Sequence, residues 1–224
     1  MVANAGPAPR TRQRAKSSQM HARIVDAFIE CLDRHGYAAA SIGRVLDCAG
    51  VSRGAMQHHF PAKADLVVAV AERLMQTSLE VVAVSARRRE RVVADELAAM
   101  WTRLVDTRAY RALLEILNAM RTDAALRARV QPTLAHWNEA FERRALVLYR
   151  PAGGDPAEVR ELLVLVRCAL RGLVIQASIA PDAALTRAVV RRLIDLVAPR
   201  LLPRDADAPA EPSPAPARTA PRRA

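Results

Sequence analysis

The sequence predicts an all-α fold, because helical patterns follow one another almost without interruption between residues 20 and 198. Apolar residues recur there at three- and four-residue spacing, which collects them on one side of a helix. The chain has only 8 glycines and 4% aromatic residues, and its strand-favouring residues rarely alternate with polar ones. With 224 residues, it is long enough for one or two domains that each have a core.

The chain is strongly basic, with 34 Lys and Arg against 23 Asp and Glu and a formal net charge of +11. This balance favours nucleic acid or an anionic membrane surface as a partner. The most apolar run, residues 161–180, carries Arg167 and Arg171 near its middle, so insertion into a membrane is costly. The three cysteines are far apart and form no CxxC pair, which argues against a disulfide framework or a zinc cluster. The chain begins with no hydrophobic segment, so we expect a soluble cytoplasmic protein.

Both ends of the chain lack a helical pattern. Residues 1–18 are Pro, Ala, Arg and Ser without periodicity, and they predict a flexible basic arm. This arm either lies along a nucleic acid or stays solvated; its cations are Arg10, Arg12, Arg14 and Lys16. Residues 203–224 are rich in Pro and Ala and cannot bury a core, so we expect a disordered tail.

The first two helices are bounded by recognisable stop and start residues. An apolar stripe predicts a helix over residues 20–35, and Gly36 ends it by taking the left-handed conformation. Ser41 is the expected N-cap of a short second helix that Gly50 ends.

The third helix follows after only one further residue. Ser52 is its expected N-cap, and Pro61 prevents its continuation beyond Phe60. The rest of the chain predicts longer amphipathic helices over residues 63–87, 91–107, 109–122, 124–149, 156–179 and 183–198.

Two short helices joined by "AGVS" predict a helix-turn-helix, whose second helix lies in the major groove of DNA. Arg53 stands in the first turn of that helix, where its guanidinium can reach a guanine edge or a phosphate. Gly54 and Ala55 keep the surface low so that the backbone can approach the groove. Met56 and Phe60 are four residues apart and face inward. The exposed face then carries Gln57 and His58, with His59 at its margin.

The stretch "RIVDAFIECLDRHGYAAASIGRVLDCAGVSRGAMQHHFPAKADLVVAV" resembles the DNA-binding domain of the TetR family of bacterial transcriptional regulators. The resemblance covers residues 20–70, with H-G-Y before the second helix, A-G-V-S in the turn and H-H-F-P-x-K at the exit. It implies a homodimer on a palindromic operator. Gln57 stands where the family usually has a tyrosine that contacts phosphate, so its contact is either a phosphate or an adenine edge. The resemblance and the exposed face of the third helix together predict the DNA-binding residues Ser41, Arg44, Ser52, Arg53, Gly54, Ala55, Gln57, His58, His59 and Lys63.

Other classes of function remain as rivals. His58 and His59, with His35, are the residues that a helical enzyme or metal-dependent protein would use. Adjacent histidines on a helix point about 100° apart, and the nearest acid, Asp65, is on the next helix. We therefore expect no catalytic site, no metal and no cofactor. The other rival is a small-molecule-binding helical protein that does not bind an operator, for which Gln57 is the only indication.

Large apolar residues of the C-terminal half are either ordinary core or the wall of a small-molecule pocket, as the resemblance implies. Few acidic residues stand among them, so an apolar or aromatic ligand is favoured over a cation. The expected pocket residues are Met75, Leu79, Trp101, Leu104, Leu113, Leu117, Met120, Trp137 and Phe141.

The last two helices have apolar faces wider than one neighbouring helix needs, so part of each is expected to meet a second subunit. Dimerisation through the final two helices is also what the resemblance implies. The expected interface residues are Leu162, Val166, Leu170, Leu173, Val174, Val189, Leu193 and Val197.

The sequence thus predicts a helix-turn-helix DNA-binding domain of three helices over residues 19–65 and a larger helical domain for ligand binding and dimerisation over residues 66–202. We interpret the protein as a homodimeric, ligand-responsive repressor of transcription, with double-stranded DNA, a second copy and an unidentified small molecule as partners. A ligand beside Met75 and Trp101 is expected to tilt the helix over 63–87, which reaches the third helix through Asp65 and Leu66.

Overall fold

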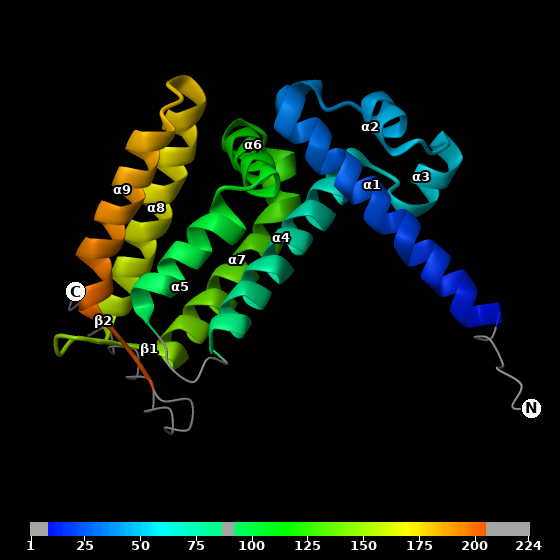
Figure 1. Ribbon diagram of the computed structural model, residues 1–224. Helices are drawn as coiled ribbons and strands as arrows, with labels where there is room; N and C mark the ends of the chain where they lie inside the picture. The colour runs from blue at the N-terminus through cyan, green and yellow to red at the C-terminus, as the bar shows by residue number, and fades with distance from the viewer. Residues whose placement is uncertain (1–8, 87–91, 205–224) are drawn as a thin grey trace, which may run out of the picture.

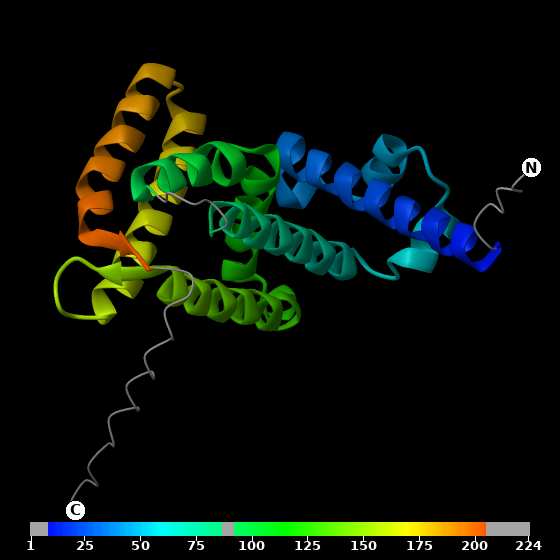
Figure 2. The same cartoon turned by 60° about the horizontal axis from the view of Figure 1, so that its bottom comes forward.

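The computed structural model describes residues 9–86 and 92–204 and confirms the all-α fold. The first three helices lie at one end of the molecule and the last two at the other (Figure 1). The helices between them connect these two ends, and the view in Figure 2 shows the same separation.

Helix α1 runs from Pro9 to Ala39, with a break at Gly36, whose φ of 73° and ψ of 170° are not helical. It therefore begins eleven residues before the predicted start, and residues 9–18 are helical where a flexible arm was expected. Arg, Gln, Ala and Lys, which favour helices, dominate this segment, and Pro is well accommodated in a first helical turn. Residues 1–8 lie outside the described part of the chain.

Helices α2 (Ile42–Ala49), α3 (Arg53–His59) and α4 (Lys63–Ala86) confirm the predicted helix-turn-helix and the long helix after it. Both predicted caps form. The hydroxyl oxygen of Ser41 accepts from the Arg44 N–H at 3.4 Å, and that of Ser52 accepts from the Ala55 N–H at 3.2 Å.

The larger domain contains α5 and the elements after it. The bounds are α5 (Val93–Met100), the π-helical turn η1 (Trp101–Val105), α6 (Arg108–Thr122), α7 (Ala124–Leu148), α8 (Ala157–Ile179), α9 (Ala183–Val197) and the 3₁₀ turn η2 (Ala198–Arg200). The helix predicted over 91–107 is thus shorter and ends in a wider turn, closed by the Asp106 N–H donating to the Trp101 carbonyl at 2.8 Å. The other bounds agree with the predicted ones within two residues.

Two three-residue strands, β1 (Tyr149–Pro151) and β2 (Leu201–Pro203), form an antiparallel pair that the sequence did not predict. The pair ties the end of α7 to the segment after α9. Pro203 belongs to β2, so the segment predicted as a tail begins inside this pair. Its residues 205–224 lie outside the described chain.

One hydrophobic core continues from α1 to β2, and α1 and α6 carry the main polar contact between the two domains. Arg111 of α6 donates to both carboxylate oxygens of Asp33 on α1, at 2.7 and 3.3 Å. Glu115 of α6 accepts from the Tyr37 N–H at 3.1 Å. The hydrogen bond from Arg111 to Asp33 raises the pKa of this guanidinium. The DNA-binding unit is therefore held directly against α6.

Candidate functional site

The turn between α2 and α3 is fixed by Gly50. Its φ of 58° is in the left-handed region, and its N–H donates to the Asp47 carbonyl at 3.3 Å. A Cβ at this position would lie 2.8 Å from an Nη atom of Arg23, which itself donates to the Gly50 carbonyl at 3.2 Å. The left-handed conformation favours glycine here, whereas the flexible end of the Arg23 side chain could shift away from a Cβ.

Helix α3 has one buried and one exposed face. Met56 is 2% exposed and Phe60, which follows the helix, is 4% exposed, so they anchor α3 to the core as predicted. The exposed face carries Arg53, Gln57 and His58. Gly54 is also exposed, and a Cβ there would meet no atom within 4 Å. This face is a low, donor-rich surface at the end of the molecule.

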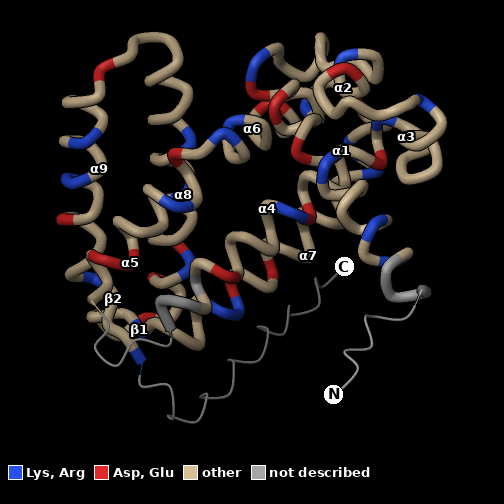
Figure 3. Tube along the Cα trace, turned by 45° about the vertical axis from the view of Figure 1, so that its right-hand side comes forward, with Lys and Arg blue, Asp and Glu red and all other residues tan. Residues whose placement is uncertain are grey.

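The cations of this end lie on α2, on α3 and on the N-terminal half of α1, far from α9 (Figure 3). Arg44 and Arg53 are both exposed, and Asp47 is the one acidic residue of α2 and α3. Exposed guanidinium groups on a short, projecting helix are suited to contact phosphates and base edges.

Lys63, at the start of α4, is half-buried and already has a partner within the chain. Its ammonium donates to the Tyr37 carbonyl at 2.7 Å and lies 4.1 Å from the centre of the Tyr37 ring. Burial lowers the pKa of Lys63. An ammonium group has three donors, so the bond to Tyr37 leaves others for a phosphate.

His59 faces back toward α1 instead of outward with His58. Its ring lies 6.2 Å from that of His21 on α1 and 5.3 Å from that of His58. Burial lowers the pKa of His59, and the neighbouring His58 and His21 lower it further. Among the residues that the structure describes, these histidines do not join a group of three or more His, Cys, Asp or Glu side chains that could hold a metal.

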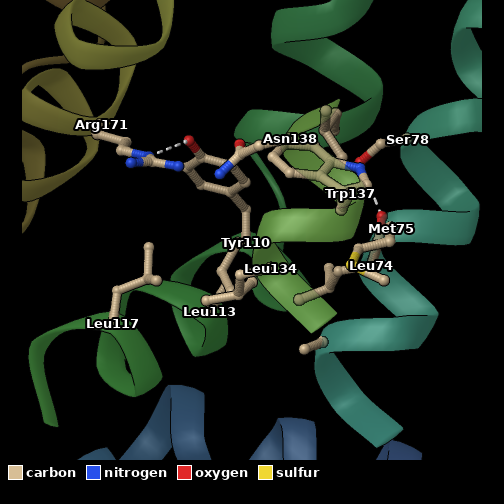
Figure 4. Close-up of a pocket in the computed structure, with 12 residues that line it drawn as sticks. Leu74, Met75, Ser78, Tyr110, Leu113, Leu117, Leu134, Trp137, Asn138 and Arg171 are labelled. Carbon is tan, nitrogen blue, oxygen red and sulfur yellow. Dashed lines mark hydrogen bonds between the residues drawn. The ribbon is translucent and has the colours of Figure 1, made fainter. Parts of the chain in front are cut away.

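The larger domain encloses a cavity of about 120 Å³ between α4, α6, α7 and α8. Its apolar wall includes Leu74, Leu113, Leu117 and Leu134, and Figure 4 shows polar side chains gathered on the opposite side. The twelve lining residues are Ala71, Leu74, Met75, Ser78, Leu104, Tyr110, Leu113, Leu117, Leu134, Trp137, Asn138 and Arg171.

Helix α8 is long and apolar enough to cross a membrane, by length and composition alone. In the single chain, only 17% of its most apolar 18-residue segment is buried. One of its stripes packs into the core, whereas another remains exposed, and α9 also has exposed large apolar residues. The large apolar residues of this exposed face are Val164, Leu165, Ile175, Ile179, Leu185, Val189 and Leu196. We refer to these seven residues as the α8/α9 face.

Comparison with known proteins identifies the family. The family model described as "Bacterial regulatory proteins, tetR family" matches residues 24–70, which span α1 to α4. An uncharacterized HTH-type transcriptional regulator of Mycobacterium tuberculosis is 31% identical over 144 residues, covering 62% of this chain and 72% of that protein. The chain belongs to the TetR family. DNA binding and regulation of transcription are therefore its general function.

Two further TetR-family comparisons cover most of the chain. HTH-type transcriptional regulator CymR of Pseudomonas putida is 27% identical over 173 residues, covering 75% of this chain and 83% of that protein. The crystal structure of the multidrug binding protein EbrR complexed with malachite green has a TM-score of 0.55 at 25% identity, covering 79% of this chain and 97% of that chain.

The predicted DNA-binding residues of this TetR-family chain fall into three groups. Arg44, Arg53, Gly54, Gln57 and His58 are exposed at the projecting end. The exposed N-caps are Ser41 and Ser52, and Ala55 is half-buried beside its cap. Lys63 and His59 point into the domain, since each has contacts with α1 or the segment that follows its break.

The predicted pocket overlaps the observed cavity in part. The residues that line it as expected are Met75, Leu104, Leu113, Leu117 and Trp137. The other four do not: Trp101 and Met120 are buried in the core, Leu79 is 37% exposed, and Phe141 lines a smaller neighbouring cavity. The sequence reasoning missed the polar residues of the wall, including Tyr110, Asn138 and Arg171. In a helical pattern such residues resemble ordinary solvent-facing positions.

The predicted dimer-interface residues need the largest correction. Five of the eight are core residues of the single chain: Leu162, Val166, Leu170, Val174 and Val197. Leu173 and Leu193 are half-buried, and only Val189 belongs to the α8/α9 face. Helix α8 has apolar residues on two opposite sides, and periodicity alone does not tell which side faces the core.

At the start of α4, Asp65 has partners in addition to the expected contact with α3. Asp65 accepts from the Ala62 N–H at 2.9 Å and from Arg129 of α7 at 2.6 Å, so its carboxylate links α4 to α7. Leu66 is fully buried in the core.

Proposed function

We propose that this protein is a homodimeric, ligand-responsive repressor that binds a palindromic operator through α3. The observation that carries this proposal is the exposed face of α3, where Arg53, Gln57 and His58 project from a helix anchored by Met56 and Phe60. A cationic, low-relief helix at the end of the molecule fits the major groove.

Different residues have different roles at the DNA. Arg53, in the first turn of α3, reads a base edge, since a guanidinium can donate two parallel hydrogen bonds to guanine. Arg44 and His58 contact phosphates, and Lys63 adds a phosphate contact while it keeps its bond to Tyr37. His59 instead positions α3 against His21 of α1. Gln57 contacts a phosphate or an adenine.

The second copy of the chain binds the α8/α9 face. Seven large apolar side chains, each 41–74% exposed, gather there on two neighbouring helices. A cluster of this size on one face is characteristic of a subunit interface. Two-fold pairing through this end leaves both α3 helices at the far ends, where each reads one half-site.

Ligand binding in the cavity reaches the DNA-binding unit through α6. Tyr110, Leu113 and Leu117 of α6 line the cavity, and Arg111 and Glu115 of the same helix hold α1. A ligand that displaces α6 therefore changes the position of α1 and α3. The effect on DNA binding cannot exceed the ligand's differential affinity for the two states. This route adds to the expected one through α4, whose Met75 also lines the cavity and whose Arg73 donates to Asp26 of α1 at 2.8 Å.

A ligand response is also supported by the similarity to EbrR, a multidrug binding protein whose crystal structure is a complex with malachite green. Regulation of transcription places this protein with DNA, which fits the cytoplasmic location predicted from the sequence.

Footprinting of the full-length protein on the DNA upstream of its own coding sequence tests the proposal. We expect a protected site with two-fold symmetry, and half-sites one helical turn or a multiple of it apart. Protection without symmetry contradicts the dimer, and uniform protection of all DNA contradicts operator recognition.

A further inference from the structure

We propose that the cavity binds a small monocyclic organic anion, whose carboxylate-like group is held by Arg171 and whose ring lies against the leucines. This inference rests on the ligand response proposed above and names the chemical class of the ligand.

Arg171 supplies the positive charge. It lies on α8, is half-buried and lines the cavity, and its Nε donates to the Tyr110 hydroxyl at 3.3 Å (Figure 4). Arg167, one turn earlier, is also half-buried and donates to the Asn138 side-chain oxygen at 2.8 Å. Within the described parts of the chain, neither guanidinium forms an ion pair, and the nearby Glu142 is paired with Arg160 at 2.8 Å. The two neighbouring cations thus have no ion-pair partner in the described residues, and the charge of Glu142 raises the pKa of Arg167 without forming an ion pair with it.

The electrostatic cost of this arrangement is reflected in the pKa of Arg167. Burial lowers the pKa of its guanidinium, and the positive charge of Arg171 lowers it further. Half-buried charges are stabilised when a charge of opposite sign binds beside them. A bound anion would supply this charge.

The remaining polar groups of the wall offer hydrogen-bond donors. The Tyr110 hydroxyl accepts from Arg171, so its own proton is free to donate outward. The side-chain oxygen of Asn138 accepts from Arg167, which leaves the amide N–H groups. The Trp137 Nε1 is buried and has no hydrogen-bond partner among the described residues. A carboxylate is made only of acceptors and matches this set.

The lining also argues against the other ligand classes. No acidic side chain stands among the twelve lining residues, so a cation would meet Arg171 without compensation. A purely apolar ligand would offer no acceptor to the Arg171 guanidinium beyond the Tyr110 hydroxyl that its Nε already has, and half-buried donors without acceptors are costly.

The volume limits the size of the ligand. The cavity measures about 120 Å³, and an apolar protein cavity of about 150 Å³ accommodates one benzene molecule. Leu74, Leu113, Leu117 and Leu134 form an apolar wall opposite the polar groups. One ring with one charged substituent matches the division of the wall, and because the cavity is smaller than 150 Å³, binding of such a ligand requires the lining to move outward.

Calorimetric titration of the DNA-free, full-length protein with benzoate, benzamide and benzylamine tests this inference. The three probes share one ring and differ in charge. We expect benzoate to bind at least tenfold more tightly than either of the other probes, a difference of about 1.4 kcal/mol.

Variants assign the preference to Arg171. R171Q should lose the preference for benzoate over benzamide, and R171K should keep part of it because the positive charge remains. R144Q is the matched control, since Arg144 is exposed on α7 and does not line the cavity, and it should bind benzoate like the wild type. Thermal unfolding of each variant shows whether it is folded.

The result that overturns the inference is wild-type protein that binds benzoate no better than benzamide or benzylamine, whatever the variants do. An R171Q protein that is folded and retains the full preference also overturns it. If benzamide or benzylamine binds more tightly than benzoate and releases the protein from DNA, the proposed regulatory function stands and only the anionic class of the ligand is refuted. Failure of the unliganded protein to bind its operator would refute the proposed function separately.

Discussion

Substitution of Leu165 by Asp on the α8/α9 face should dissociate the dimer. Leu165 is 59% exposed in the single chain. Full burial of such a side chain stabilises by about 1.5–3 kcal/mol, so burial of the exposed fraction contributes about 0.9–1.8 kcal/mol per copy. A two-fold interface contains the residue twice, which gives about 1.8–3.5 kcal/mol, or a weakening of the dimer of about 20- to 400-fold. Desolvation of the two new carboxylates adds to this loss.

Sedimentation velocity across a concentration series measures the dimer dissociation constant of L165D. V147D is the matched control, because Val147 is 52% exposed but lies on α7, outside the α8/α9 face. We expect V147D to dimerise like the wild type. An unchanged dissociation constant for L165D refutes the reasoning, and so does an equal weakening by V147D.

Cysteine reactivity gives a second reading of the same interface. Cys168 is exposed on α8 three residues after Leu165, whereas Cys48 is exposed on α2. Alkylation of Cys168 should be slow in the wild-type dimer and fast in L165D, and Cys48 should react equally in both. Equal rates at Cys168 would show that no partner covers this face.

Four further predictions concern the DNA-binding unit. R53A should weaken binding to cognate DNA by about 1–3 kcal/mol and relax sequence specificity. Fluorescence polarisation with cognate and scrambled duplexes measures this change. Equal weakening of binding to both duplexes would contradict a contact between Arg53 and a base edge. G54A should stabilise the fold by about 0.5–1 kcal/mol, because alanine favours a helix and no atom lies within 4 Å of its Cβ. The same substitution should weaken DNA binding. Denaturant unfolding measures the first effect and the DNA titration measures the second. The pKa of His59 is lower in the folded state than in the unfolded state, so the unfolded state binds more protons near and below pH 6.5. The free energy of unfolding should therefore fall as the pH drops through 6.5. Between pH 7 and 5, H59Q should lose less melting temperature than the wild type. Burial raises the pKa of Cys31 to about 12, and the neighbouring Cys48 thiol contributes to this increase. Mass spectrometry should therefore find Cys31 unmodified by iodoacetamide at pH 8. Labelling of Cys31 as fast as that of Cys48 would contradict this prediction.

The bounds of α2 and α3 could be predicted because their limits are local. Ser41 and Ser52 cap helices by bonds to residues three positions later, and Gly50 is needed for a left-handed turn. Each of these signals depends on a few neighbouring residues. The inward orientation of Met56 and Phe60 follows from their four-residue spacing alone.

The larger domain was less predictable because its contacts join distant parts of the chain. The sequence alone gives no sign that Arg171 meets Tyr110, 61 residues earlier, or that Arg111 binds Asp33, 78 residues earlier. Arg171 was read only as an obstacle to membrane insertion. Strands of three residues, such as β1 and β2, give too short a pattern to be distinguished from a loop.

Which side of α8 remains exposed could not be predicted for a related reason. On α8, the stripe with Leu162 and Val166 and the stripe with Leu165 and Ile175 are equally apolar, and the fold buries only the first. Only the packing of α7, α9 and η1 around the helix decides which stripe remains exposed.

The central claim, recognition of a specific operator by α3, is tested most directly by fluorescence-polarisation titration of the unliganded protein. The titration compares the duplex protected in footprinting with a scrambled duplex of equal length, at two salt concentrations. The account predicts binding to the protected duplex at least about a thousandfold tighter than to the scrambled one. Equal dissociation constants for the two duplexes, with the same dependence on salt, would contradict it.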